Sequence, residues 1–433
     1  MNPLATPKPL KLAMLVLVTH AVLLSYLLLG AVRAQTINGQ EHGQTGNSTT
    51  ALDSKVAIER ANPQRTGVYP SGATPPTGEI LWESWKLFVM KRGRIEWGRT
   101  TTMSDRTGSI TFSGPDFFWP YEGVGYSDPI VADGILYFSL YIGDGYLYAL
   151  DARTGEVRWR AKREKGVYSP PTVADKTLYV GADSGIFYAF DLEKNQEKWR
   201  QTRMDQSMVE GSPTVAEGVV YYAANNGNLY ALSTKTGELK WTFDAKSQYL
   251  SAPAVSDGMI YFTNREYLFG LETKSGKEKW KLQLKEGGRA PAVANGLVYF
   301  RDYEGHIRTV DAKTGQPVPK PHKDHQTGAR IVINGQMIYF TGWNTGSLFA
   351  VDAMTRETAW TFSDTSELHC TAPIADAQRI YFTCDDGRLY AVDAKTGKKA
   401  WATARKKAPI STPVVADSML YFISDDGKVY GVK

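Results

Sequence analysis

The sequence predicts an all-β fold, an eight-bladed β-propeller of four-stranded blades in which an N-terminal strand completes the C-terminal blade. Three observations predict it. The chain repeats itself about every 40 residues, short β-branched and aromatic runs alternate with turn residues, and the last repeat lacks a segment that stands near the N-terminus. A length of 433 residues alone would suggest two or three domains, and the repeat replaces them with one ring.

The first half of each repeat carries a Pro and, eight residues later, a Tyr. The clear copies are Pro129–Tyr137, Pro171–Tyr179, Pro213–Tyr221, Pro253–Tyr261, Pro291–Tyr299, Pro373–Tyr381 and Pro413–Tyr421, with Ile331–Tyr339 as the eighth. The second half reads Leu-Tyr-Ala-Leu-Asp-x-x-Thr-Gly-x-x-x-Trp, as in Leu147–Trp159. Asp-Gly and similar turns between these runs predict hairpins, and four strands fit each unit.

The two ends of the repeat region complement one another. The last unit stops at Lys433, before its Trp-bearing strand, and Thr77–Trp82 matches the missing strand as it appears in Thr154–Trp159. An open sheet edge invites aggregation, so we expect the N-terminal strand to close the ring. Eight first halves of the repeat and eight second halves, one of them supplied by Thr77–Trp82, then make eight blades.

The run Ala149–Trp159, repeated as Ala391–Trp401, resembles the tryptophan-docking motif of the PQQ-type repeat (quinoprotein-like) propeller family. The resemblance implies that one Trp in each blade packs between neighbouring blades, where its indole N–H needs a partner. These blade-docking residues are Trp82, Trp159, Trp199, Trp241, Trp280, Trp360 and Trp401. Pro319 stands where another Trp would fall, and we expect a looser junction after the fifth blade.

The resemblance implies one of two functions. BamB-like outer-membrane assembly propellers are non-catalytic scaffolds that bind envelope or secreted proteins without a cofactor. The alternative, the quinoprotein dehydrogenases, oxidises an alcohol or sugar with PQQ and calcium in the central funnel, and commonly has an adjacent Cys-Cys disulfide. This chain has two separated Cys, and no Asp, Glu or Asn is matched to that calcium site. We therefore expect a scaffold with no catalytic residue, metal ligand or cofactor.

One column of the repeat gives candidate site residues. Two residues before the Pro column stand Ser127, Ser169, Gly211, Ser251, Arg289, Ala329, Thr371 and Ser411. Small residues suit crowded inner strands, and Arg289 is the exception. With Glu210, Arg330 and His369 in the same loops, Arg289 is a candidate for a polar funnel lining that binds an anionic group. The alternative is ordinary solvated loop charge.

A long insertion supplies further candidates. Trp82 and Pro129 are 47 residues apart, where other blades use 11 to 14 between the same positions. The excess, about residues 85–120, is rich in Arg and aromatic residues, and long loops on rigid scaffolds tend to be functional. Candidate partner contacts there are Arg92, Arg94, Trp97 and Trp119. The alternative is a β-hairpin that covers an apolar face of the propeller.

The N-terminus predicts export. Residues 1–34 combine two Lys with an apolar run over residues 12–32, which indicates a cleaved signal peptide or an N-terminal membrane anchor. Residues 35–76 read as a flexible linker, and residues 77–433 as the propeller. A net charge of +5 is too small to indicate nucleic-acid binding. We expect a periplasmic or extracellular protein.

The two Cys leave an alternative open. Cys370 and Cys384 flank a predicted hairpin. A two-residue turn would place their thiols on opposite faces of the hairpin, whereas a three-residue turn would align them for a disulfide.

Overall fold

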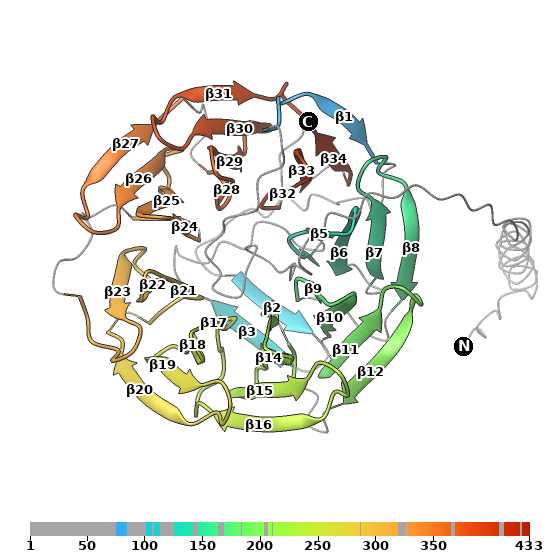
Figure 1. Cartoon of the computed structure of the whole chain (residues 1–433), viewed down its shortest axis with the longest axis vertical. Helices are drawn as coiled ribbons and strands as arrows, with labels where there is room; N and C mark the ends of the chain where they lie inside the picture. The colour runs from blue at the N-terminus through green and yellow to red at the C-terminus, as the bar shows by residue number, and fades with distance from the viewer. Residues whose placement is uncertain are drawn as a thin grey trace, which may run out of the picture. The chain divides into compact units, whose positions relative to one another are not determined.

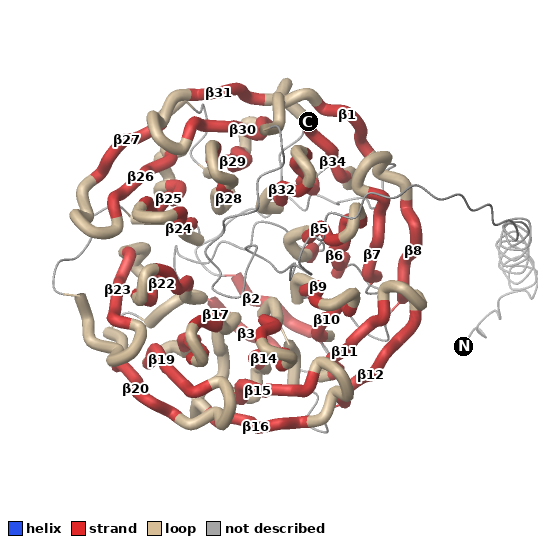
Figure 2. The backbone as a smooth tube through the Cα atoms, viewed as in Figure 1, coloured by secondary structure: helices blue, strands red, loops and turns tan. Residues whose placement is uncertain are grey.

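The computed structural model describes residues 75–84, 101–105, 108–112, 125–141, 146–162, 169–182, 184–202, 207–209, 211–285, 287–318, 326–328, 330–364, 369–406, 411–424 and 427–433. All the regular elements of this part of the chain are strands, and eight of their nine sheets are arranged as blades around a ring (Figures 1 and 2). The predicted all-β, eight-bladed propeller is confirmed.

Blades 1 to 4 follow one another along the chain. Blade 1 contains β5 (Ile130–Ala132), β6 (Ile135–Tyr141), β7 (Tyr146–Asp151) and β8 (Val157–Lys162), and the short β4 (Gly125–Tyr126) pairs with β6. Blade 2 contains β9 (Thr172–Ala174), β10 (Thr177–Gly181), β11 (Ile186–Asp191) and β12 (Gln196–Thr202). Blade 3 contains β13 (Thr214–Ala216), β14 (Val219–Ala223), β15 (Asn228–Ser233) and β16 (Leu239–Asp244). Blade 4 contains β17 (Ala254–Ser256), β18 (Met259–Thr263), β19 (Tyr267–Glu272) and β20 (Glu278–Gln283).

Blades 5 to 8 complete the ring. Blade 5 contains β21 (Ala292–Ala294), β22 (Leu297–Arg301) and β23 (Ile307–Asp311). Blade 6 contains β24 (Val332–Asn334), β25 (Met337–Thr341), β26 (Leu348–Asp352) and β27 (Thr358–Phe362). Blade 7 contains β28 (Ile374–Ala375), β29 (Arg379–Cys384), β30 (Arg388–Asp393) and β31 (Lys399–Ala402). Blade 8 contains β32 (Val414–Ala416), β33 (Met419–Ile423), β34 (Val429–Val432) and, from the other end of the propeller, β1 (Ile80–Glu83).

Strand β1 closes the ring as expected from the sequence. It pairs antiparallel with β34, with Ile80 opposite Val432 and Glu83 opposite Tyr430. The Thr77 hydroxyl donates to the carbonyl of Lys433 at 2.8 Å. In Figure 1, β1 lies beside the C-terminal strands at the outer rim.

The core lies between the blades. The first three strands of a blade are buried on both faces, as in β10, whereas the fourth alternates between partly buried and exposed residues, as in β12. One buried cluster joins Tyr179 and Phe187 of blade 2 to Val220 and Tyr222 of blade 3. Each sheet therefore packs against its two neighbours, which explains why the inner strands are continuous apolar runs.

Blade 5 is irregular at its outer edge. In place of a fourth strand, the described chain shows one bridge between Val310 and Pro317, with the Val318 N–H donating to the Thr309 carbonyl at 3.0 Å. Pro lacks an N–H and is confined to sheet edges, so the Pro-rich run from Pro317 onward suits this outermost position. Pro319 itself lies outside the described residues.

The insertion between β1 and β4 contains a two-stranded hairpin. Strands β2 (Thr101–Asp105) and β3 (Gly108–Phe112) pair antiparallel and join no blade sheet. The candidate contacts Arg92, Arg94, Trp97 and Trp119 lie outside the described residues, as does the whole of residues 1–74 with the predicted signal or anchor. Nowhere in the part of the chain that is described is a helix long and apolar enough to cross a membrane.

Candidate functional site

At six of the eight junctions, the tryptophan column links a blade to the next through one hydrogen bond. Six indole N–H groups donate to a backbone carbonyl of the following blade. The pairs are Trp82 with Ala152 (3.1 Å), Trp199 with Thr234 (3.1 Å), Trp241 with Thr273 (2.9 Å), Trp280 with Ala312 (3.1 Å), Trp360 with Ala394 (3.2 Å) and Trp401 with Pro76 (2.7 Å). Each ring also packs on the Tyr of its own blade, as Trp199 does on Tyr179 at a centroid distance of 5.9 Å.

The docked rings require glycine in the turn that they cover. Gly237 has a φ of +74°, and a Cβ added there would lie 2.7 Å from Cδ2 of Trp199. Gly155 stands in the same relation to Trp82, at 2.4 Å from Cε3. The glycine of this turn is therefore required for two reasons. It adopts the left-handed backbone conformation, and it has no side chain that would clash with the docked ring.

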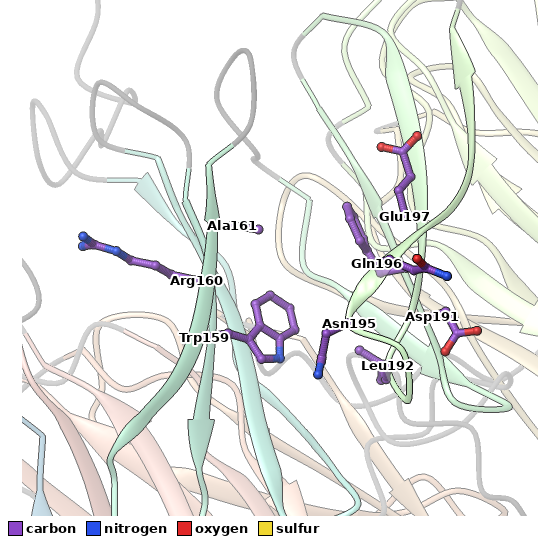
Figure 3. Close-up of a pocket in the computed structure, with 9 residues that line it drawn as sticks. Trp159, Arg160, Ala161, Asp191, Leu192, Asn195, Gln196 and Glu197 are labelled. Carbon is purple, nitrogen blue, oxygen red and sulfur yellow. The ribbon is translucent and has the colours of Figure 1, made fainter. Parts of the chain in front are cut away.

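Two junctions depart from this arrangement, and one of them contains a cavity. Asn195 stands at the glycine position before blade 2's outer strand, with a φ of 50°. A cavity of about 240 Å³ opens there between Trp159 and the turn carrying Leu192 and Asn195 (Figure 3). Within the described residues, the Trp159 indole N–H has no hydrogen-bond acceptor. At other junctions, the space taken here by the Cβ of Asn195 is occupied by the docking indole ring. The Asn195 side chain therefore keeps the Trp159 ring away from the turn, which explains the cavity.

The other departure lies between blades 5 and 6, where Pro319 replaces the docking Trp. Arg356 stands at the corresponding glycine position, with a φ of 65°. It is 4% exposed, and burial lowers its pKa while an electrostatic interaction with Tyr299 opposes that shift. Because no indole covers this turn, a side chain fits, and Arg356 fills the space. The junction that we expected to be loose is closed by a different residue.

The small residues two positions before the Pro column also form hydrogen bonds between strands. We call the end of the ring where each blade's first strand begins the start face. There, one extra residue before the Pro column shifts the register, so that Ser127 opposes Ser139 while Ile130 opposes Tyr137. The Ser127 hydroxyl then accepts from the Ser139 N–H at 2.9 Å. The same bond forms in four other blades, with Ser169, Ser251, Thr371 and Ser411 as acceptors.

The same register shift explains how the thiols of the two Cys come to lie on one face of the hairpin. Near the turn of blade 7, Ile374 opposes Tyr381, which is the register of a two-residue turn. The extra residue then brings Cys370 opposite Cys384, and the two form a disulfide. The argument that a two-residue turn separates the thiols was wrong because it omitted the irregularity at Ala372–Pro373.

An ion pair lies across the start face. Arg330 Nη1 is 3.0 Å from Asp128 Oδ2, and Asp128 Oδ1 accepts from the Thr412 N–H at 3.0 Å. These residues precede the innermost strands of blades 6, 1 and 8. Blades 1 and 6 are not neighbours, so the ion pair connects distant parts of the ring near its axis (Figure 1).

The charge state of this pair follows from two opposing effects. Burial among protein atoms raises the pKa of Asp128 to about 6 and lowers that of Arg330 to about 10. Their side chains nevertheless keep 20% and 42% of their surfaces exposed, and an opposite charge at 3.0 Å favours the ionised carboxylate. We therefore treat the pair as ionised at neutral pH.

Among the described residues, Arg289 and Arg330 contact different neighbours, and those of Arg289 lie within blade 5. Its N–H donates to the carbonyl of Arg301 at 2.8 Å, and its guanidinium lies over the ring of Tyr303 at 5.1 Å. His369 is exposed, its carbonyl accepting from the Asp385 N–H, and Glu210 lies outside the described residues. Asp128 and Arg301 were missed from the sequence. Asp128 and Arg330 are the charged residues in the column before the Pro, which is a signal that could have found them.

The one group of possible metal ligands found among the described residues is a poor match for the calcium of a PQQ site. Calcium takes six to eight oxygen ligands. The group of possible metal ligands found within the described ranges is Asp302, Glu304 and His306 in the blade 5 turn. Asp302 Oδ1 already accepts from the His306 N–H at 2.8 Å, and Oδ2 accepts from Arg308 Nε at 2.7 Å. The adjacent cation makes this turn a poor calcium site.

Comparisons with known proteins agree with this architecture. A family model described as outer membrane protein assembly factor BamB matches residues 71–213, 199–268, 253–339 and 344–433. BamB from Moraxella catarrhalis is similar in structure at 16% identity and a TM-score of 0.58, over 70% of this chain and 95% of that one. Quinohemoprotein alcohol dehydrogenase from Comamonas testosteroni is similar at 14% identity and a TM-score of 0.62, over 86% and 79%. The computationally designed Ika8 protein is similar at 17% identity and a TM-score of 0.63, over 72% and 97%.

These solved structures include an assembly factor, an enzyme and a designed protein, so at such identities they establish the fold alone. A search of curated proteins finds no match. The family model, in contrast, matches nearly all of the propeller and more than half of the chain. The chain therefore belongs to the family of PQQ-type repeat propellers described as outer membrane protein assembly factor BamB.

Proposed function

We propose that this protein is an exported, non-catalytic propeller that binds partner proteins in the cell envelope. The observation that carries the proposal is the Asp128–Arg330 ion pair, held also by Thr412, at the axis of the ring. A quinoprotein would need this region for its cofactor, whereas here the polar groups bind one another. Family membership supports the same choice, and a disulfide suits a protein exported to an oxidising compartment.

Two measurements on the full chain test the proposal. Purified protein is mixed with PQQ and calcium, and quinone absorbance and dye reduction are followed with an alcohol or a sugar. We expect no substrate-dependent dye reduction. Cross-linking in an envelope fraction, followed by capture of a tagged chain, is expected to recover a discrete protein partner. Substrate-dependent dye reduction would overturn the scaffold assignment in favour of an oxidoreductase.

The insertion over residues 85–120 is a further proposed contact region, through Arg92, Arg94, Trp97 and Trp119. Deleting residues 86–118 tests this role. Lost partner capture with unchanged thermal stability supports it. Unchanged capture with reduced stability means instead that the hairpin covers the propeller's own surface.

A further inference from the structure

Two arginines of blade 5, Arg289 and Arg301, lie together on the start face. The backbone bond from the Arg289 N–H to the Arg301 carbonyl makes them direct neighbours across the inner strand pair. Within the part of the chain that the structure describes, neither guanidinium has a carboxylate at ion-pair distance. The nearby carboxylate of Asp302 is engaged by Arg308 and by the His306 N–H.

The guanidinium of Arg301 is incompletely satisfied. Its Nη1 donates to the Thr327 carbonyl at 2.8 Å, but its buried Nε has no acceptor. Burial first, and the charge of Arg289 second, lower the pKa of Arg301 to about 10, against the opposing charge of Asp302. A buried donor without an acceptor and a pair of like charges both cost free energy. An oxyanion placed between the two guanidiniums would offset the repulsion between their charges.

Exposed aromatic side chains lie on the same face as this pair. Three large aromatic residues are prominently exposed among the described residues, Tyr249 at 51%, Tyr303 at 45% and Trp343 at 50%. All three lie in loops of the start face, on blades 3, 5 and 6. Arg289 lies over Tyr303, and Arg265 lies over Tyr249 at 4.0 Å.

These residues form one continuous surface. A Cβ added to Gly287 would lie 2.2 Å from Cε2 of Tyr303 and 3.1 Å from the carbonyl oxygen of Arg265, so the blade 4 and blade 5 loops touch. The Thr327 N–H donates to the Gly305 carbonyl, which connects the blade 5 turn to the segment beside Trp343. We call the surface made by Arg265, Arg289, Arg301, Tyr249, Tyr303 and Trp343 the arginine–aromatic surface.

We propose that the arginine–aromatic surface binds an acidic segment of a partner protein, with a carboxylate held between Arg289 and Arg301. The inference rests on the proposed scaffold function and names the chemistry of the partner. Carboxylates match the planar donors of arginine, and Tyr, Trp and Arg are the residues enriched in protein interfaces. The exposed rings beside the arginines favour a peptide over a free inorganic anion, which would leave them uncovered.

The test uses the full chain and fluorescein-labelled hexaglutamate, with hexaglutamine as the uncharged probe. Fluorescence anisotropy at low salt measures the affinity. We expect hexaglutamate to bind, hexaglutamine not to bind, and Arg289→Ala/Arg301→Ala to weaken binding by about tenfold or more, as loss of interface arginines does. Added salt is expected to weaken the wild-type complex because the charges are exposed to solvent.

The matched control removes the same charge from the opposite face. Lys313 is exposed in the turn after β23 of blade 5, and Lys395 is exposed in the turn between β30 and β31 of blade 7. Lys313→Ala/Lys395→Ala is expected to bind hexaglutamate within about twofold of the wild type, since surface charges this far away are screened. Thermal melts verify folding, and the single variant Arg289→Ala covers the case in which the double variant unfolds.

Three results would overturn the inference: no hexaglutamate binding, equal weakening in both double variants, or displacement by inorganic phosphate at concentrations as low as those of unlabelled peptide. Partner capture separates this inference from the proposed function. If the wild type and Arg289→Ala/Arg301→Ala capture the same partner equally, the surface assignment fails and the scaffold function stands. If the wild type captures none, the scaffold function itself fails.

Discussion

Changing Gly237 to Asn is expected to reproduce, at another junction, the gap that Asn195 opens beside Trp159. An added Cβ at Gly237 would lie 2.7 Å from Cδ2 and Cε3 of Trp199. Carbon atoms pack at about 3.5–4.0 Å, so the ring has to move by about 1 Å. The movement weakens the bond from the Trp199 indole to the Thr234 carbonyl, which is 3.1 Å long in this structure.

The size of the effect follows from these contacts. Loss of one hydrogen bond costs about 1 kcal/mol. Uncovering about 40 Å² of the indole costs about 1 kcal/mol more at roughly 25 cal/mol per Å². We therefore expect Gly237→Asn to lower the free energy of unfolding by about 2 kcal/mol, beyond the cost of placing Asn in a left-handed backbone conformation.

The matched control is Gly258→Asn. Gly258 has a φ of +72°, close to the +74° of Gly237, but a Cβ added there would have no atom within 4 Å. The two variants share the backbone cost and differ in the clash with the ring. Urea unfolding, with unchanged slopes, gives the difference between their free energies of unfolding. Equal losses in the two variants would refute the claim that glycine is needed for the docked ring.

Three further results are expected. Arg356 has a φ of 65°, and Ala and Met share its backbone cost. Arg356→Ala opens the junction beside Tyr299 and lowers the free energy of unfolding by about 1–2 kcal/mol, whereas Arg356→Met fills the space without a buried charge and costs less; the reverse order in urea unfolding would contradict the packing role. Replacing Cys370 and Cys384 together by Ser opens a short disulfide loop and costs about 3 kcal/mol, whereas thermal melts that do not respond to a reducing agent would contradict this. Arg158 and backbone N–H groups lower the pKa of Asp151 to about 2, so its contribution is complete above about pH 4 and is lost as the pH falls towards 2; Asp151→Asn should flatten that acid limb in a pH series.

The ring could be predicted from the sequence because the contacts between its blades repeat. Each blade places the same Pro, Tyr and turn residues at the same spacing, and packing between blades follows from periodicity. Closure by β1 was predictable for a related reason, because Thr77–Trp82 matches the strand missing after Lys433. Local patterns predict contacts that every repeat makes in the same way.

Contacts that occur only once in the ring could not be predicted from such local patterns. The Asp128–Arg330 pair joins residues 202 positions apart in non-neighbouring blades, and no local pattern connects them. The loss of one docking Trp indicated a loose fifth junction, but that Arg356 fills the space depends on a side chain from the following blade. The thiol alignment depended on one irregular residue in a strand pair. The partner of a single charge, the residue that fills a single space and the register at a single irregularity can be found only from the three-dimensional structure.

The completion of blade 8 by β1 has a consequence for how the chain is made. Thr77 and Lys433, which are bonded in the closed ring, are 356 residues apart. The first strand of the propeller to be synthesised therefore waits for the last one before it can pair. Until then two sheet edges are exposed, and both are templates for pairing with other chains. Synthesis thus imposes an interval in which an unclosed ring needs protection, and truncation at either end of the propeller would make that interval permanent.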